Sequence, residues 1–426
     1  MIVVMRALQG ETAIVKGEAL CICCDWSFGD GLHEILAGWD VMGLSKDDLA
    51  KLVALRHELH QHPEVSGQEE QTAARLVAFL DRNGLRPDAM HHDLGGHGLA
   101  LEYIGADDGP TVMIRCELDA LPIVEQNAIP HRSSHEGVAH LCGHDGHMAT
   151  VIALAFLLRD QPLKRGRVIL LFQGAEETGA GAQALLDDAR FEPLYPDYIF
   201  ALHNLPKLPL GEVQLGTGVV CCASRGMKIT LIGKTSHAAA PQDGVSPVGA
   251  MATLMKDIPT FCTGARRDEN FVLTTITHAN VGVPNFGVAP ADATLWVTLR
   301  TVTQSRMDAL VDDMERLVAT EAFTNGLAFD VQYQDVFDAT ENHGDAVAHI
   351  SKAARINGIT PHDLPEPMSW SEDFGRFAKT GAKAGMFFLG SGIDQPQLHN
   401  PDFDFPDELI PIGAKLFWDI ISDVMG

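Results

Sequence analysis

The sequence predicts an α/β protein with a zinc-peptidase-like layout, in which a second domain is inserted into the first. Short apolar runs alternate with amphipathic helical segments, a block with a different strand pattern interrupts them, and the alternation then resumes. We expect the first domain over residues 42–215 and 336–426, and the inserted domain over residues 216–335. A length of 426 residues agrees with two or three domains.

Helical patterns come first in the chain. Ser45 and Asp48 form a capping-box pattern ahead of apolar residues at helical spacing, which predicts a helix that ends before Pro63. A second amphipathic helix is predicted over residues 69–82. Three apolar runs then predict strands that are buried on both faces, with a helix over residues 148–159 after the first of them. These strands are expected at residues 111–116, 167–172 and 198–202.

Polar side chains follow each of these three strands. Glu117 and Asp119 follow the first, Glu176 and Glu177 the second, and His203 the third. In open α/β sheets, functional groups collect in the loops beyond the carboxyl ends of the strands. The pattern therefore predicts an active site at this edge of the sheet.

The inserted block alternates apolar and polar residues in four strands separated by two helices. The order βαββαβ is typical of a ferredoxin-like unit. Its strands are expected at 226–233, 271–278, 293–300 and 327–333, and its helices at 247–261 and 305–324. After it, residues 345–426 predict two helices flanking a strand at 386–389.

The charge of the chain excludes several classes of partner. With 31 basic and 57 acidic residues, its formal net charge of −26 repels nucleic acids and anionic membrane surfaces. The longest uninterrupted apolar run, residues 151–158, is too short to cross a bilayer. We therefore expect a protein that acts on a small molecule and binds neither nucleic acid nor membrane.

The N-terminal region and the cysteines indicate in which cellular compartment the protein is expected. Eight cysteines in a chain of this length do not suggest a disulfide framework, and no export signal is evident, so we expect a cytoplasmic protein. Cys21, Cys23 and Cys24 are of metal-ligand type, but an irregular or untranslated leader is the reading we favour. Helical patterning starts after Met42, which makes residues 1–41 an extension and a candidate for non-native sequence.

Metal-ligand residue types cluster near the predicted site. Gly143 between Cys142 and His144 allows a tight turn, so that both side chains can approach one ion, although a helix-capping loop would give the same pattern. Glu176 and Glu177 repel each other, and a metal would make their joint ionisation tolerable. A solvated acidic turn is the alternative. His203 and His399 are weak signals singly but gain weight together with these strand-end loops.

Eight short segments along the chain support a more specific interpretation. They are RHELH (56–60), LDALP (118–122), CGHDGH (142–147), EETGAG (176–181), HNLP (203–206), SHAAAP (236–241), SEDF (371–374) and HNPDFD (399–404). As a set they resemble the M20 metallopeptidase family, and more narrowly its amidohydrolase branch of hippurate hydrolases, auxin-conjugate hydrolases and N-acetyl-diaminopimelate deacetylases. The resemblance implies a zinc-peptidase-like catalytic domain with an inserted lid or dimerisation domain.

The resemblance also assigns roles at the metal site. It implies that Glu176 is the general base and that Asp119 orients a ligand from outside the coordination sphere. Cys142 stands where other members have a bridging aspartate, so its thiolate is expected to bridge two divalent ions of Zn, Mn, Co or Ni. The implied ligands of the two ions are Cys142, His144, Glu177, His203 and His399.

Residues of the inserted domain are given roles with the substrate. By resemblance, His237 reaches into the site of a second subunit in a homodimer and polarises the scissile carbonyl. Asn285 matches a position that contacts the carboxylate of the substrate. Arg300 could bind that carboxylate too, or form a structural ion pair.

Two positions depart from the branch pattern, and one cluster is interpreted as structural. Glu117 replaces an aspartate, and its longer side chain could alter metal choice or approach the site. Trp370 stands where glycine is frequent and could narrow the substrate pocket. We expect His57, His60 and His62 to be structural.

The sequence therefore predicts a two-metal enzyme that hydrolyses the amide bond of small N-acyl amino acids, hippurate-like or N-acetyl-amino-acid-like, through an activated water. A di- or carboxypeptidase that acts on short peptides is the alternative within enzymes. A non-catalytic relative that binds metal or an amino-acid conjugate is the alternative outside them.

Overall fold

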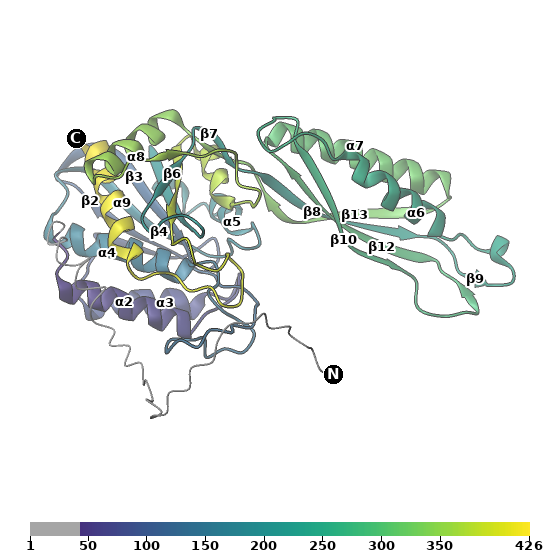
Figure 1. Cartoon of the computed structure of the whole chain (residues 1–426), viewed down its shortest axis with the longest axis horizontal. Helices are drawn as coiled ribbons and strands as arrows, with labels where there is room; N and C mark the ends of the chain where they lie inside the picture. Colours follow the sequence, from purple (N-terminus) through teal and green to yellow (C-terminus); the bar gives the residue numbers. More distant parts are fainter. Residues whose placement is uncertain (1–42) are drawn as a thin grey trace, which may run out of the picture. The chain divides into compact units, whose positions relative to one another are not determined.

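The computed structural model describes residues 43–426, so Cys21, Cys23 and Cys24 and the expected extension over residues 1–41 lie outside the described residues. The described chain contains an eight-stranded mixed sheet and a four-stranded antiparallel sheet, both with helices against them (Figure 1). This architecture confirms the predicted α/β class. Between residues 43 and 426, no helix combines the length and the apolar character needed to cross a membrane.

The first two helices form as predicted. Helix α2 (Lys46–Gln61) is opened by a full capping box, in which the Ser45 hydroxyl accepts from the Asp48 amide and the Asp48 carboxylate accepts from the Ser45 amide. Helix α3 (Glu70–Arg82) buries Leu76, Phe79 and Leu80 on one face. Leu52 and Leu59 of α2 are also buried in the main core.

The centre of the larger sheet holds the three predicted strands. Strands β3 (Asp107–Glu117), β4 (Arg165–Gln173) and β5 (Tyr198–Leu205) run parallel in the order β4-β3-β5, and the middle residues of each are buried. Because parallel strands end at the same edge of a sheet, the loops that follow them meet there. The polar residues singled out from the sequence are therefore brought together.

Strands that the sequence pattern did not predict complete this sheet. A hairpin of β1 (Ala89–Leu94) and β2 (Gly98–Ile104) adds to β4 in antiparallel orientation. At the other edge lie the short strands β6 (Val213–Leu215) and β15 (His362–Asp363). The polar, half-exposed residues of β1 and the brevity of β6 and β15 explain why alternation did not reveal them.

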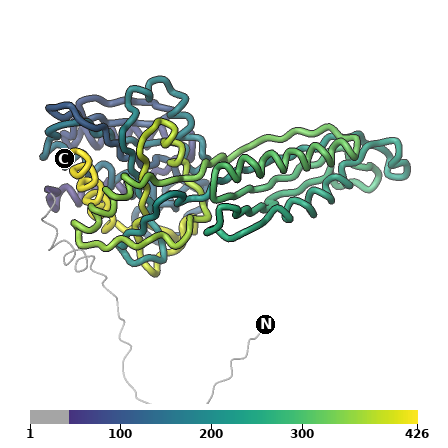
Figure 2. The backbone as a smooth tube through the Cα atoms, turned by 90° about the horizontal axis from the view of Figure 1, so that it is seen from above, coloured from purple at the N-terminus to yellow at the C-terminus, as the bar shows by residue number. Residues whose placement is uncertain are grey.

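The C-terminal part of the chain returns to the larger sheet. Strand β16 (Lys383–Gly390) pairs with β5 in parallel over eight residue pairs, and α8 (Gly344–Ile356) and α9 (Leu409–Met425) follow the predicted helical pattern. Helix α9 packs against α4 (His144–Asp160). Figure 2 shows the C-terminal yellow segments in the same body as the N-terminal purple ones.

The smaller sheet has the predicted βαββαβ connectivity. Strands β8 (Ala223–Ile232), β10 (Val272–Val281), β12 (Asp292–Thr301) and β13 (Ala328–Phe337) lie in the order β10-β12-β8-β13. Helices α6 (Val248–Asp257) and α7 (Gln304–Thr324) cover one face of the sheet with their own apolar core (Figure 1). The domain boundaries at 215/216 and 335/336, and a lid or dimerisation role, stay proposals.

Candidate metal centre

The start of helix α4 brings two potential ligands together. The helix begins at His144, four residues before the sequence pattern predicted, and Gly143 precedes it with a φ of +96°. A Cβ atom at Gly143 would lie 2.4 Å from the side-chain oxygen of Asn204. Only glycine suits both this backbone conformation and this close approach, so the turn between Cys142 and His144 depends on it.

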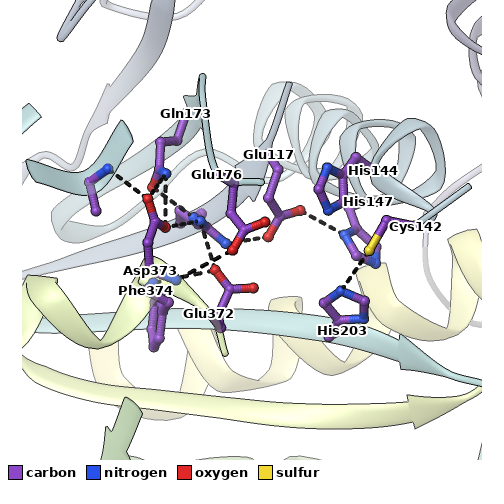
Figure 3. Close-up of polar contacts among 12 residues, drawn as sticks. Glu117, Cys142, His144, His147, Gln173, Glu176, His203, Glu372, Asp373 and Phe374 are labelled. Carbon is purple, nitrogen blue, oxygen red and sulfur yellow. Dashed lines mark hydrogen bonds and ion pairs between the residues drawn. The ribbon is translucent and has the colours of Figure 1, made fainter. Parts of the chain in front are cut away.

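Cys142, His144 and His203 form a buried triad of metal-ligand types. Their ligand atoms all lie within 4.8 Å of one another, and the Cys142 sulfur is 3.4 Å from Nε2 of His203 (Figure 3). Cys142 comes from the loop before α4, His144 is the first residue of α4, and His203 comes from β5. The loop and the strand meet at the predicted edge of the sheet.

A second triad shares the same cysteine. The ligand atoms of Cys142, Glu177 and His399 also lie within 4.8 Å of one another, and a carboxylate oxygen of Glu177 is 3.6 Å from Nε2 of His399. Glu177 follows β4, and His399 lies in the segment that follows β16. Because Cys142 belongs to both triads, its sulfur would be shared if each triad held an ion.

Hydrogen bonds outside the triads orient the imidazole rings. Nδ1 of His144 donates to the carbonyl of Asp119 at 2.9 Å, and Nδ1 of His203 donates to the carbonyl of Asn204 at 2.8 Å. These bonds leave Nε2 of each ring as the free electron-pair donor. The Asp119 carboxylate accepts from the Ser66 hydroxyl at 2.7 Å and from the Glu177 amide at 2.9 Å. Asp119 therefore contacts His144 through its carbonyl and the Glu177 loop through its carboxylate.

The donor set fits divalent metal ions. Nε2 of His144 and Oε1 of Glu177 are buried without a hydrogen-bond partner among the described residues, and they lie 3.8 Å apart. Leaving a buried polar atom unpaired costs about 1–3 kcal/mol, and coordination of a metal would remove that cost. Thiolate, imidazole and carboxylate together suit Zn, Mn, Co or Ni.

Glu176 lies beside the triads in an acidic, buried environment. It is 5% exposed, accepts a hydrogen bond from the Asp373 amide at 3.3 Å, and has Glu372 as a neighbour (Figure 3). Glu177 is a second acidic neighbour. Burial, and next the charge of Glu372, raise the pKa of Glu176 well above its usual value. Burial also raises the pKa of Glu177 to about 7, against the opposing effect of His144. Two divalent ions would oppose both shifts.

Comparison with known proteins identifies the family. Residues 113–423 match the model of peptidase family M20/M25/M40. The chain belongs to this family. The predicted resemblance is thereby confirmed, and the protein is a hydrolytic enzyme.

Relatives within the family are similar over most of their length. N-acetylcysteine deacetylase of Bacillus subtilis is 28% identical over 378 residues, which cover 88% of this chain and 97% of the relative. Hippurate hydrolase of Campylobacter jejuni is 27% identical over 365 residues, covering 85% and 94%. The crystal structure of a dinuclear metal binding peptidase from the M20 family of Bacillus subtilis has a TM-score of 0.74 and 27% identity, covering 89% of this chain and 99% of that one.

One histidine of the CGHDGH motif is used differently from its neighbour. His147 lies one helical turn after His144, and its ligand atoms are close to those of Glu117 and His144. Both of its ring nitrogens are occupied, Nδ1 by Glu117 at 2.7 Å and Nε2 by the side-chain oxygen of Asn204 at 2.7 Å. His147 therefore has no ring nitrogen free to bind a metal, and it supports the centre through its hydrogen bonds.

Glu117 lies close to His144 but is bound by residues outside the triads. It binds His147 and forms a buried ion pair with Arg115, whose guanidinium also donates to Asp373 at 2.7 Å. Sequence reasoning missed this network of Arg115, His147 and Asp373. The one available signal was the position of His147 in the same motif as two candidate ligands.

Trp370 forms part of the wall of the site. Its ring centroid lies 5.0 Å from that of His203 and 5.7 Å from that of Phe388. The indole therefore packs on a candidate metal ligand, where a glycine would leave open space.

The three predicted residues of the inserted segment are not part of the two triads. His237, on strand β9 (Ser236–His237), is exposed and accepts from the amide of Ala239, and Asn285 accepts from the amide of Gly287. Arg300 donates to the carbonyl of Ser369 at 2.8 Å. No carboxylate between residues 43 and 426 forms an ion pair with Arg300, so its contact is with the segment that carries Trp370.

Proposed function

We propose that this enzyme hydrolyses the amide bond of small N-acyl amino acids, with hippurate-like and N-acetyl-amino-acid-like compounds as candidate substrates. The observation that carries the proposal is the pair of triads that share Cys142, one buried and one reaching the surface at His399, next to the carboxylate of Glu176. The relatives named as a deacetylase of N-acetylcysteine and as a hippurate hydrolase support this choice of substrate. The donor set and the dinuclear relative agree with two divalent ions as cofactors.

Each residue of the centre has a role in this scheme. When bound by Cys142, His144, Glu177, His203 and His399, two divalent ions would polarise the substrate carbonyl and lower the pKa of a bound water. Glu176 accepts the proton of the attacking water and passes it to the departing amine. Asp119 fixes His144 and the Glu177 loop through the hydrogen bonds described above.

We further propose that the enzyme works as a homodimer. His237 is exposed, as a group that serves a second subunit must be, and would stabilise the oxyanion, an effect worth about 3–4 kcal/mol. Asn285 and Arg300 would bind the carboxylate of the substrate. Mixed dimers of Glu176→Gln and His237→Ala chains test this arrangement, because one intact site would form in each mixed dimer. Mixtures that stay as inactive as either parent would contradict it.

A cytoplasmic location belongs to the same proposal. Cys116, Cys142, Cys221, Cys222 and Cys262 are free in the described structure, as expected in a reducing compartment. Fractionation of the source cells, with the enzyme traced by antibody, tests this location.

The general-base assignment leads to the first prediction. Glu176→Gln keeps the shape of the side chain but removes the proton acceptor, so we expect kcat to fall by about 10²–10⁴-fold. Elemental analysis should still find two ions per chain. Loss of metal, or turnover near that of the wild type, would contradict the assigned role.

The substrate class is tested by a panel of N-acetyl and N-benzoyl amino acids beside dipeptides and C-terminally extended peptides. We expect kcat/KM to be highest for the N-acyl amino acids. Preference for the peptides would favour the di- or carboxypeptidase alternative, and tight binding without turnover of any compound would favour a non-catalytic relative.

A further inference from the structure

A buried arginine outside the metal centre contacts carboxylates of the two segments that carry His144 and His399. We propose that Arg56 is a positioning residue, which holds the loop of Cys142 and His144 at a fixed separation from the segment of His399. Loss of its guanidinium group then weakens the Cys142–Glu177–His399 site before the other one. The inference rests on the proposed function only in taking these triads as metal sites.

The guanidinium of Arg56 joins elements that are far apart in the sequence. Arg56 lies on α2, is 1% exposed, and donates through Nη1 to Asp145 at 3.2 Å and to Asp404 at 2.7 Å. Nη2 lies 2.9 Å from Nε2 of His131, and Nε forms an ion pair with Asp407. One side chain therefore connects α2 with α4 and with the segment that follows β16.

Both carboxylates are close in sequence to candidate ligands. Asp145 directly follows His144 in the first turn of α4, and Asp404 lies in the segment that begins with His399. A ligand from each triad is thus tied to the same guanidinium. No other arginine or lysine among residues 43–426 forms ion pairs with both segments.

The backbone at His399 needs such support. His399 has a φ of +66°, in the left-handed region that residues other than glycine rarely adopt. The surrounding structure must therefore hold it there. Its amide donates to the carbonyl of Leu141 at 2.8 Å. Phe405 packs over Gly146 so closely that a Cβ there would lie 2.2 Å from the ring. The Arg56–Asp404 ion pair is a further contact that holds the segment of His399 against the start of α4.

The geometry explains why arginine is required here. Its planar group presents donors in several directions at once, whereas the lysine ammonium is a single charged point. Arg56→Lys keeps the charge but cannot reach Asp145, Asp404 and Asp407 together. We therefore expect only partial rescue by lysine.

The test measures metal binding and does not depend on turnover. Metal-stripped protein is titrated with Co²⁺ alone, and binding is followed by the visible absorption of cobalt bound to the Cys142 thiolate and by elemental analysis. We expect two ions in the wild type. In Arg56→Met and Asp404→Asn, we expect one tight ion and a second bound at least tenfold more weakly, with Arg56→Lys in between.

A control separates positioning from general stability. Arg167→Met removes a partly buried arginine of strand β4, which pairs with Glu102 and touches neither ligand segment. This variant should keep two tight metal sites. If Arg56→Met does not fold by circular dichroism, Asp404→Asn decides, since that side chain is 28% exposed. Two unchanged sites in folded Asp404→Asn, or equal weakening in Arg167→Met, would overturn the proposal.

Failure of the Arg56 proposal can be distinguished from failure of the proposed function. A wild type that binds two Co²⁺ ions but hydrolyses no compound of the panel would refute the proposed function and leave the Arg56 result standing. An active wild type with unaltered metal sites in both variants would refute only the role of Arg56. A wild type with a single cobalt site would refute both.

Discussion

At the scale of single residues, the histidines of this centre differ in which ring nitrogen the protein itself uses. His144 and His203 each give Nδ1 to a backbone carbonyl and keep Nε2 for another partner. His147 gives both nitrogens to protein groups. His144 and His147, three positions apart, are thus a potential ligand and a supporting residue, respectively.

The glycine between two ligands gives a prediction at this scale. Gly143→Ala would place a Cβ 2.4 Å from the Asn204 oxygen and in a left-handed conformation, so we expect loss of metal and a lower free energy of unfolding. The conformational part alone costs about 1–2 kcal/mol. Gly137→Ala is the matched control, since Gly137 also has a positive φ but nothing within 4 Å. Metal content is the measurement, and equal effects of the two substitutions would contradict the argument.

Trp370 gives a second prediction for a single side chain. Trp370→Gly removes the ring that packs on His203, so we expect the ratio of kcat/KM for N-benzoyl over N-acetyl substrates to rise by about tenfold, the scale of pocket discrimination for apolar groups. Trp370→Phe keeps a ring and should leave the ratio closer to that of the wild type. A ratio unchanged in both variants would show that the indole does not limit the acyl group.

Residue types at strand ends indicated candidate metal ligands but left other interpretations open. The resemblance to the M20 family then assigned the ligand set of Cys142, His144, Glu177, His203 and His399. The hydrogen bonds of His147 could not be predicted, because they depend on how α4 packs next to the ends of β3 and β5. Arg56 belongs to the RHELH segment, but its burial and contacts could not be predicted, since an arginine in an amphipathic helix usually faces solvent.

At the scale of secondary structure, the predictions succeeded where hydrophobic periodicity was strong. The three central strands and the two helices of the inserted segment form within a few residues of the predicted bounds. The start of α4 was missed because His144 to His147 are polar or small, and because Gly143 has no side chain to cap the helix. Hairpin β1–β2 was missed because its first strand is half exposed.

The contact between α2 and α4 leads to a prediction on pH. Burial alone would lower the pKa of His60, but Asp145, at 2.9 Å, and Glu125, at 3.1 Å, raise it to about 9. Its stabilising effect is therefore complete below about pH 6.5 and is lost as the pH rises through 9. We expect His60→Gln to cost up to about 3 kcal/mol at pH 6 and much less at pH 9.5. Urea unfolding at several pH values measures this, and a penalty that does not change with pH would refute it.

At the scale of the whole molecule, the acidic character of the chain is only partly explained by the metal centre. Two divalent ions would change the formal charge from −26 to −22, because −26 + 4 = −22. Most of the negative charge therefore lies elsewhere and opposes the approach of an anionic substrate. Under the proposed function, a local cation must supply the attraction for a carboxylate, and Arg300 is the one proposed for this role.

Removal of the metals gives the last prediction. Ions that bind only the folded state each raise the free energy of unfolding by about 2.7 kcal/mol when present at 100 times their dissociation constant. We therefore expect chelation to lower Tm by roughly 5 °C or more and to abolish activity. Both should return when Co²⁺ or Zn²⁺ is restored. His203→Gln, with one triad broken, should show a smaller shift, and a Tm insensitive to chelator would contradict metal binding by the triads.

The pairing of β5 with β16 has a consequence for how the protein folds. During synthesis β5 emerges long before β16, so its edge stays unpaired while the inserted segment is made. The inserted segment has a core of its own and can fold first. His399 lies beyond β16 and arrives later still, so the second triad closes only at the end. We expect folding during synthesis to pass through an intermediate with the four-stranded sheet formed and the β5 edge open to aggregation, which makes assembly of the metal centre a late event.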